Sequence, residues 1–214
     1  MFMKKYKSII FDLDGTLINT DLYVVLNYLR VIEKYSKNPI PDLKELVYLS
    51  GPPLKETLLK YCPKELYDEI AEDFFAWSKD NCNKYSKLYD NEIETLIELR
   101  RRGYKLGVVT NKNTYAVNNV FEYFDFFKYF DAIYPLEKCV EPKPNPHGLI
   151  ACAKELGNSI EDTIYIGDSI ADMEAGVNAN MDIAYIKLGL KEYKSDIKPN
   201  VMITSFTQML KLFK

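Results

Sequence analysis

Short runs of β-branched and aromatic residues recur along the chain, and each has the length of one buried strand. They predict strands at residues 7–12, 105–110, 132–134, 163–167, 182–187 and 201–204. From about residue 90 onward, apolar residues at helical spacing predict helices at 92–102, 116–124, 145–156, 170–178 and 206–213. Strands that alternate with helices are typical of parallel βαβ units. We therefore predict an α/β fold with a Rossmann-like, doubly wound parallel sheet as its core.

One long interval breaks this alternation, because the next helix–strand unit after the first strand does not begin until about residue 90. Apolar residues at helical spacing within the interval predict a helix from Asp21 to about Tyr35, with Asp21 as its N-cap. Further helical patterns occur at 42–48, after Pro53 and at 63–83. The stretch 21–85 is thus predicted to be entirely helical.

The interval is most simply explained as an insertion into the sheet domain. We predict a core of residues 1–16 and 87–214, with a helical cap of residues 17–86 inserted after the first strand. Parallel sheets bind their ligands at the carboxyl ends of the strands. The cap is therefore expected to lie over the functional site.

The composition excludes several classes of protein. Of the 214 residues, Lys and Arg number 28 and Asp and Glu 31, so the formal net charge is −3. This balance does not favour binding to nucleic acid or to an anionic membrane. No apolar stretch approaches the roughly 20 residues that span a bilayer, and residues 1–7 are not followed by the apolar segment of a signal peptide. We expect a cytoplasmic protein.

Cysteine and histidine are also informative. The four cysteines are scattered without C-x-x-C spacing, so neither a zinc site nor a disulfide framework is expected. The chain has a single histidine, His147, at the start of a predicted helix. Chemistry that needs two histidines is therefore excluded within one chain, and we interpret His147 as a surface residue.

Polar side chains collect at the carboxyl ends of the predicted strands. They are Asp12 and Asp14 after the first strand, Thr110 and Asn111 after the second, Lys143 after the third, and Asp168 and Asp172 after the fourth. In a parallel sheet these ends lie along one edge, so the side chains should converge on one site. Solvated charges without a common role would not all fall at this position.

Carboxylates packed together repel one another and resist ionisation. A hard divalent cation with oxygen ligands, Mg²⁺, relieves that repulsion and also offsets the negative charge of a phosphate ester. An ammonium such as Lys143 and a hydroxyl such as Thr110 can hold phosphoryl oxygens. One aspartate can then act as a nucleophile and form an acyl phosphate, while a second carboxylate two residues along relays the proton.

Four ordered segments resemble the motifs of the haloacid dehalogenase (HAD) superfamily. They are Phe11-Asp-Leu-Asp-Gly-Thr-Leu17, Val109-Thr-Asn-Lys112, Lys143-Pro144 and Gly167-Asp-Ser-Ile-Ala-Asp172. The similarity runs from residue 8 to about residue 190 and is greatest to the phosphoglycolate-phosphatase-like branch, which carries an α-helical cap. Asp-x-Asp-Gly-Thr at a strand end is specific by itself, and four motifs in the same order argue strongly against chance agreement.

The resemblance implies a role for each site residue. Asp12 corresponds to the nucleophile and Asp14 to the general acid and base, while Thr110 and Lys143 correspond to phosphate-binding residues; Asn111 is a further candidate for substrate binding. Mg²⁺ would be held by Asp12, the main-chain carbonyl of Asp14 and Asp168. Asp172 would support the metal through water or through the other ligands.

The resemblance also points to a loop of the cap that selects the substrate. The segment Gly51-Pro-Pro-Leu-Lys-Glu56 is similar to that loop, so Gly51 and Lys55 are candidates for substrate binding. One departure is visible, because Tyr89-Asp-Asn91 replaces the Pro-Gly turn that commonly precedes the helix leading to the second motif. This difference concerns the hinge of the cap.

Each candidate also has an ordinary structural interpretation. Asp12 and Asp14 could be turn formers, Lys143 a solvated surface lysine, and Asp168 a helix N-cap. The complete set at one sheet edge favours the catalytic interpretation. The dense aromatic series from Phe121 to Phe130 is interpreted as core packing or a subunit contact, which leaves a monomer and a homodimer both open.

The sequence therefore predicts a Mg²⁺-dependent phosphatase that hydrolyses a small phosphomonoester, of the phosphoglycolate type, through an aspartyl-phosphate. Inorganic pyrophosphatase and nucleotidase activities are close alternatives on the same scaffold, followed by a sugar phosphomutase. A dehalogenase is disfavoured because it does not need the proton relay of Asp14. A non-catalytic phosphate-binding module is the alternative from another class. The expected partner is a small phosphorylated metabolite.

Overall fold

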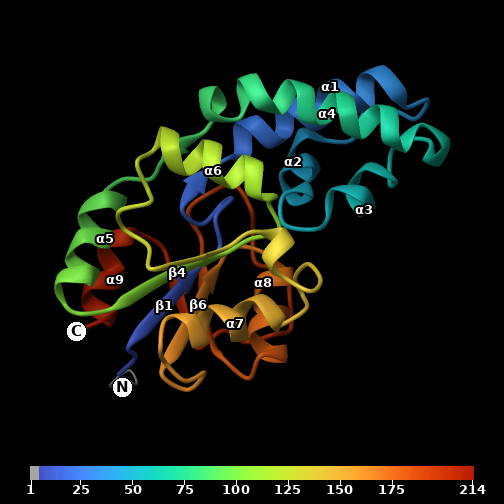
Figure 1. Cartoon of the computed structure of the whole chain (residues 1–214). Coiled ribbons are helices and arrows are strands. Elements are labelled where there is room, and N and C mark those ends of the chain that lie inside the picture. Colours follow the sequence, from blue (N-terminus) through green and yellow to red (C-terminus); the bar gives the residue numbers. More distant parts are fainter. Residues whose placement is uncertain (1–4) are drawn as a thin grey trace.

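The computed structural model describes residues 5–214, and a parallel sheet lies at the centre of that part of the chain (Figure 1). Within these residues the sheet has six strands in the order β5-β4-β1-β6-β7-β8, and neighbouring strands are parallel. The strands are β1 (Ser8–Phe11), β4 (Lys105–Val109), β5 (Ala132–Tyr134), β6 (Thr163–Gly167), β7 (Asp182–Ile186) and β8 (Val201–Ile203). The predicted α/β class is confirmed. Residues 1–4, on which the predicted core and the expected lack of a signal peptide partly rest, lie outside the described residues.

Different helices cover the two faces of the sheet, because the side chains of a strand alternate between its faces. In β1, Ile9 and Phe11 pack into one apolar cluster and Ile10 into another. The first cluster includes residues of α5 (Glu92–Arg101), α6 (Thr114–Tyr123) and α9 (Phe206–Leu212), and the second includes residues of α7 (His147–Glu155) and α8 (Ile170–Asn178). Burial on both faces explains why β1 is a continuous apolar run rather than an alternating one.

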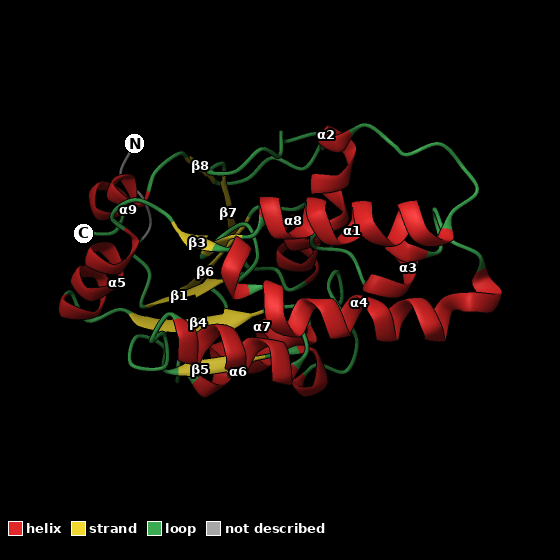
Figure 2. Ribbon diagram, turned by 90° about the horizontal axis from the view of Figure 1, so that it is seen from above, coloured by secondary structure: helices red, strands yellow, loops and turns green. Residues whose placement is uncertain are grey.

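A layer of helices lies over the carboxyl ends of the strands (Figures 1 and 2). We call its members the cap helices: α1 (Asp21–Tyr35), α2 (Leu43–Leu46), α3 (Leu54–Leu58) and α4 (Tyr67–Asn81), with short 3₁₀ turns at Val47–Leu49, Lys64–Leu66 and Asn83–Tyr85. The two long helices, α1 and α4, run side by side, with the ring of Tyr28 edge-on to that of Phe74 at 5.2 Å between centroids. Burial of such aromatic side chains holds the cap helices together.

A two-stranded antiparallel ribbon joins the cap helices to the sheet domain. It pairs β2 (Ile18–Asn19) with β3 (Lys87–Leu88). The sequence did not predict this ribbon, because strands of two residues show no periodicity. The predicted N-cap role of Asp21 is wrong: Thr20 occupies that position, and the Asp21 carboxylate instead accepts a hydrogen bond from the main-chain nitrogen of Leu190 at 2.8 Å.

The aromatic series between α6 and β5 divides into buried and exposed members. Phe121, Phe126 and Phe130 are buried in the core, as predicted, whereas Tyr123 and Phe127 are exposed. Among residues 5–214 no helix is both long and apolar enough to cross a membrane.

Candidate active site

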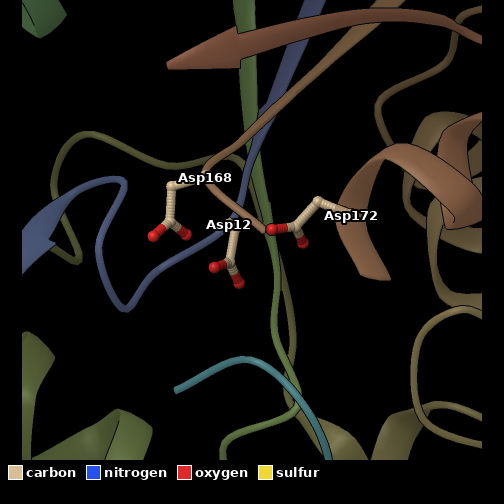
Figure 3. A group of neighbouring side chains, drawn as sticks. All are labelled: Asp12, Asp168 and Asp172. Atoms are coloured by element: carbon tan, nitrogen blue, oxygen red, sulfur yellow. The ribbon is translucent and has the colours of Figure 1, made fainter. Parts of the chain in front are cut away.

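Three buried carboxylates meet where strands β1 and β6 end (Figure 3). Asp12 directly follows β1, Asp168 directly follows β6, and Asp172 lies in the first turn of α8. Since β1 and β6 pair in parallel register, with Phe11 opposite Ile166, their carboxyl ends are level. One carboxylate oxygen from each aspartate lies within 4.8 Å of the others. The predicted convergence of these three residues is therefore present in the structure.

The carboxylates of this cluster are electrostatically unequal. Burial raises the pKa of Asp12 to about 8, with Asp172 adding to the rise and Lys143 opposing it. Burial also raises the pKa of Asp168, although the ammonium of Lys191 opposes it. For Asp172 burial acts in the same direction, but Lys143, Ser169 and Tyr165 outweigh it and hold the pKa of that carboxyl below its ordinary value.

Lys143 lies at the centre of the cluster. Its ammonium is 2.6 Å from an oxygen of Asp12, 2.6 Å from an oxygen of Asp172 and 3.0 Å from the hydroxyl of Tyr165. The interpretation of Lys143 as a solvated surface lysine is thus wrong, because the residue is 4% exposed. The carboxylates outweigh the effect of burial and raise the pKa of Lys143, so the group stays charged at neutral pH.

Asn111 fixes the loop that carries Lys143. Its amide oxygen accepts a hydrogen bond from the Lys143 main-chain nitrogen at 2.8 Å, and its amide nitrogen donates to the Lys143 carbonyl at 3.3 Å and to the Gly51 carbonyl at 2.8 Å. One side chain thereby joins the end of β4, the Lys143 loop and the cap loop. Asn111 and Gly51, both candidates for substrate binding, are hydrogen-bonded to each other, so the amide of Asn111 already has protein partners.

Asp14 stands apart from the three-carboxylate cluster and faces Lys112. The Lys112 ammonium donates to both oxygens of Asp14, at 2.8 and 3.0 Å. The main-chain nitrogen of Lys112 also donates to the hydroxyl of Thr110 at 3.1 Å, which helps to orient that side chain. Lys112 was not among the predicted site residues, although it is the last residue of the second motif.

Two other residues of the site were also missed. The hydroxyl of Tyr165 donates to Asp172 at 2.7 Å, and its only sequence signal is a tyrosine inside the apolar strand β6. The ammonium of Lys191, which is 5% exposed, lies 2.7 Å from Asp168 and 3.2 Å from the carbonyl of Ser50 in the cap loop. Lys191 follows β7 at the same sheet edge as the predicted residues, which is the signal that could have identified it.

Gly15 explains why glycine follows the aspartates of the first motif. Its φ of +87° is a conformation that other residues rarely adopt, and a Cβ atom there would lie 2.2 Å from a carboxylate oxygen of Asp168. The chain therefore passes close enough to Asp168 to hold its side chain. The carbonyl of Gly15 accepts a hydrogen bond from the Tyr89 hydroxyl at 3.1 Å, so the segment after β3 is anchored to the same turn.

A cavity of about 800 Å³ separates the cap helices from the strand ends. Asp12, Asp14, Thr110 and Lys143 line it on the side of the sheet, and Gly51 and Lys55 line it on the side of the cap. Lys55 is exposed and its ammonium lies over the ring of Tyr67, 5.4 Å from the centroid. His147 is exposed at the start of α7 and does not line the cavity.

The residues of the cluster fit a hard divalent cation. Asp12, Asp168 and Asp172 supply only carboxylate oxygens, the donors that Mg²⁺ prefers. Both oxygens of Asp172 are already engaged, one by Lys143 and Tyr165 and the other by Ser169. The oxygens of Asp168 also have partners, Thr16 at 3.4 Å and Lys191 at 2.7 Å, but Asp172 is fully buried whereas Asp12 and Asp168 keep a small exposed fraction.

Comparison with known proteins assigns the family. Residues 9–186 match the family model described as haloacid dehalogenase-like hydrolase. The chain is 30% identical over 209 residues to Pyrophosphatase PpaX of Bacillus velezensis, and the aligned region covers 97% of this chain and 96% of that protein. It is 29% identical over 208 residues to Pyrophosphatase PpaX of Halalkalibacterium halodurans, and the aligned region covers 95% of this chain and 94% of that protein.

Solved structures share the fold over nearly the whole chain. The crystal structure of a predicted phosphoglycolate phosphatase from Haemophilus somnus matches with a TM-score of 0.85 at 23% identity, covering 98% of this chain and 99% of that one. A predicted phosphatase from Clostridium acetobutylicum matches with a TM-score of 0.84 at 24% identity, covering 98% and 100%. The similarity inferred from the four motifs is confirmed, and the chain belongs to the haloacid dehalogenase-like hydrolase family.

Proposed function

We propose that the protein is a Mg²⁺-dependent phosphatase that hydrolyses a small phosphomonoester through an aspartyl-phosphate on Asp12. The observation that carries this proposal is the position of Asp12, which lies on the cavity wall in contact with Lys143 while Asp14 lines the same cavity. A binding module would need the cation but not Asp14 as a further carboxylate on the wall of the same cavity. The names of the relatives, pyrophosphatase and phosphoglycolate phosphatase, both denote hydrolases that release phosphate, from an anhydride and from an ester respectively.

The reaction takes place in two steps. A carboxylate oxygen of Asp12 attacks phosphorus as the ester P–O bond breaks, and protonated Asp14 gives its proton to the departing alkoxide. Ionised Asp14 then takes a proton from a water molecule, whose oxygen attacks the phosphorus of the aspartyl-phosphate. The acyl-phosphate bond breaks, inorganic phosphate forms and the Asp12 carboxylate is restored. Lys143 and the Thr110 hydroxyl hold the equatorial oxygens in both steps.

The metal would be held by Asp12, Asp168 and the main-chain carbonyl of Asp14. When bound, Mg²⁺ supplies positive charge that offsets the charge on the phosphoryl oxygens. We assign Asp172 to a supporting role, because it positions Lys143 at 2.6 Å and caps α8 together with Ser169.

The same proposal divides the chain into a core of residues 1–16 and 87–214 and a cap of residues 17–86. The β2–β3 ribbon supports this division, since it brings the two connections together. We propose that cap closure excludes bulk water until the leaving group has departed. The four free cysteines are consistent with the cytoplasm, and the expected partner is a small phosphorylated metabolite, with the protein a monomer or a homodimer.

Pyrophosphate hydrolysis is the second candidate, because the relatives at 29% and 30% identity are named pyrophosphatases. It uses the same nucleophile and differs only in the leaving group. Nucleotidase and sugar phosphomutase activities remain alternatives on this scaffold. A mutase would convert β-glucose 1-phosphate into glucose 6-phosphate without release of phosphate.

Hydrolysis of p-nitrophenyl phosphate tests the proposal. We expect turnover with Mg²⁺ that is lost in EDTA, and a loss of at least about 10³-fold in Asp12→Asn. Asp162→Asn is the matched control, since Asp162 pairs with Lys7 at the surface far from the cavity. Equal rates with Mg²⁺ and EDTA would exclude the metal, and retained turnover in Asp12→Asn would exclude Asp12 as the nucleophile.

A further inference from the structure

The cavity is much larger than the substrates named for the relatives require. Its volume of about 800 Å³ lies near the upper end of the range of about 300–1,000 Å³ for drug-sized ligands. Each water molecule occupies about 30 Å³ of liquid, so pyrophosphate or phosphoglycolate would fill only a minor part of this space. The remaining volume lies against the cap helices, beyond Asp12 and Lys143.

The buried part of the wall on the cap side is aromatic. Tyr23 and Tyr28 line the cavity, and their hydroxyls form hydrogen bonds with the hydroxyls of Ser78 at 2.7 Å and Thr57 at 2.5 Å. Phe74 lies next to Tyr28 on the same wall. Since the hydroxyls already have partners and Tyr23 and Tyr28 are only 7% and 4% exposed, these tyrosines present a small apolar part of each ring to the cavity.

Two exposed aromatic side chains line the cavity from different parts of the fold. Phe75 of α4 is 47% exposed and Tyr115 of α6 is 60% exposed, and both line the cavity. Phe75 comes from the cap helices and Tyr115 from the sheet domain. Exposed aromatic residues that converge on a cavity are a typical feature of ligand sites, because a flat group can pack between them.

The cations of the cavity do not match a second phosphate group. Lys112 is paired with Asp14, and Lys143 with Asp12 and Asp172. Lys55 and Lys79 also line the cavity, but both are exposed and Glu72 lines it with them. A highly charged leaving group would therefore meet rings and a mixed set of solvated charges rather than a group of buried cations.

From the aromatic residues that line the cavity we infer that the substrate is a phosphomonoester whose alcohol carries a flat, uncharged aromatic group, which we call the aromatic body. Aryl-substituted alcohols and nucleosides share this chemistry. The phosphoryl group is bound at Asp12 and Lys143, and the aromatic body packs among Tyr23, Tyr28, Phe75 and Tyr115. Pyrophosphate and phosphoglycolate lack this body. The inference rests on the proposed phosphatase function and specifies the leaving group of that reaction.

Two substrates of equal chemical reactivity test this inference. Propyl phosphate and 3-phenylpropyl phosphate both release a primary alcohol, so a difference in kcat/KM between them reports packing of the ring rather than leaving-group chemistry. We expect kcat/KM to be at least about tenfold higher for the phenyl compound, and higher for uridine 5′-monophosphate than for pyrophosphate or 2-phosphoglycolate. Equal values for the two alkyl phosphates, or a preference for pyrophosphate, would overturn the inference.

Variants of the exposed aromatic residues test where the ring of the substrate binds. Phe75→Ala and Tyr115→Ala should each lower kcat/KM for 3-phenylpropyl phosphate about fivefold or more and lower kcat/KM for propyl phosphate by a clearly smaller factor. Phe127→Ala and Tyr123→Ala are the controls, because Phe127 is also 47% exposed and Tyr123 is 62% exposed, and neither lines the cavity. A loss in Lys55→Met and Lys79→Met without one in Phe75→Ala would instead indicate an anionic leaving group and overturn the inference. If the protein hydrolysed none of these esters in the presence of Mg²⁺, the proposed phosphatase function itself would be wrong, which is a result distinct from a wrong substrate class.

Discussion

The ammonium of Lys112 binds both carboxylate oxygens of Asp14, at 2.8 and 3.0 Å, on the wall of the cavity. The two side chains are only 12% and 18% exposed, so water screens the pair weakly. Burial by itself would lower the pKa of Lys112, but the carboxylate of Asp14 outweighs it and raises that pKa. Lys112 is therefore a permanent cation that holds the proposed proton relay in position.

Lys112→Met should weaken proton transfer more than substrate binding. We expect kcat/KM for an alkyl phosphate to fall roughly tenfold or more, because its alkoxide needs the proton of Asp14. The fall should be smaller for p-nitrophenyl phosphate, whose phenolate leaves without protonation. Since kcat/KM reports the steps up to departure of the leaving group, the comparison isolates that proton transfer.

The control for this prediction is Lys128→Met, which removes a surface lysine paired with Asp125. It should leave kcat/KM for both esters unchanged. An equal loss on both esters in Lys112→Met would mean that Lys112 acts on structure or binding rather than through Asp14.

Gly15→Ala should separate backbone strain from the contact with Asp168. Alanine at a φ of +87° costs about 1–2 kcal/mol of folding free energy, and its Cβ would also collide with the carboxylate of Asp168. Gly103→Ala is a matched control, because Gly103 has a φ of +88° and nothing within 4 Å of its would-be Cβ. We expect thermal destabilisation in both variants, larger in Gly15→Ala by the cost of the collision with Asp168, and a loss of about 10²-fold in kcat only in Gly15→Ala. Equal activity of the two folded variants would contradict the role assigned to this contact.

The sheet and the strand-end residues could be predicted because both leave a periodic or positional signal in the sequence. The run Ser8–Phe11 is apolar because β1 is buried on both faces, and Asp12 and Asp168 follow strands that pair in register. Parallel pairing places such strand ends together whatever the intervening sequence. Only the family resemblance distinguished the nucleophile from the other carboxylates.

Lys112, Tyr165 and Lys191 could not be predicted with the same ease, because no local pattern specifies their partners, whether the partner is 98 positions away, as for Lys112, or only seven, as for Tyr165 and Asp172. Lys112 meets Asp14 across 98 positions of sequence, and nothing in its neighbourhood specifies that partner. The N-cap assigned to Asp21 failed for the same reason, since its carboxylate binds the distant main-chain nitrogen of Leu190. Local sequence patterns predict helices, strands and the residues at the carboxyl ends of the strands. The pairing of individual side chains follows from tertiary packing instead.

Lys191 should compete with a divalent cation for Asp168. In Lys191→Met the carboxylates lose an ammonium that lies 2.7 Å from Asp168, so they repel one another more strongly without metal. We expect the rise in melting temperature between EDTA and saturating Mg²⁺ to be larger than in the wild type, by about 2–4 °C for each kcal/mol of added stabilisation. Lys194→Met, which removes an exposed lysine of the same loop, should match the wild type. An unchanged rise in Lys191→Met would show that the two cations do not compete.

Glu92, the first residue of α5, lies just after the β3 connection to the cap helices. The residue is 1% exposed, and one of its carboxylate oxygens accepts a hydrogen bond from the Tyr89 main-chain nitrogen at 3.0 Å. The other oxygen has no hydrogen-bond partner among the described residues. Burial raises the pKa of Glu92 from its ordinary value of 4.5 to about 8, and the Tyr89 nitrogen opposes this only in part.

Glu92→Gln should therefore stabilise the protein at neutral and alkaline pH. Below about pH 4.5 both the folded and the unfolded wild type carry the proton, so the group has no effect on the pH dependence of stability. Between about pH 4.5 and pH 8 the unfolded chain loses the proton while the folded chain retains it, and the free energy of unfolding falls as the pH rises, by up to about 1.4 kcal/mol per pH unit. Glutamine can still accept the hydrogen bond from Tyr89 but has no proton to lose.

Urea denaturation at pH 5, 6.5 and 8 tests this prediction. The free energy of unfolding of Glu92→Gln should exceed that of the wild type by an amount that grows with pH, whereas Glu94→Gln, on the exposed side of the same turn, should show no such trend. A constant difference between Glu92→Gln and the wild type at all three pH values would mean that Glu92 is ionised in the folded protein.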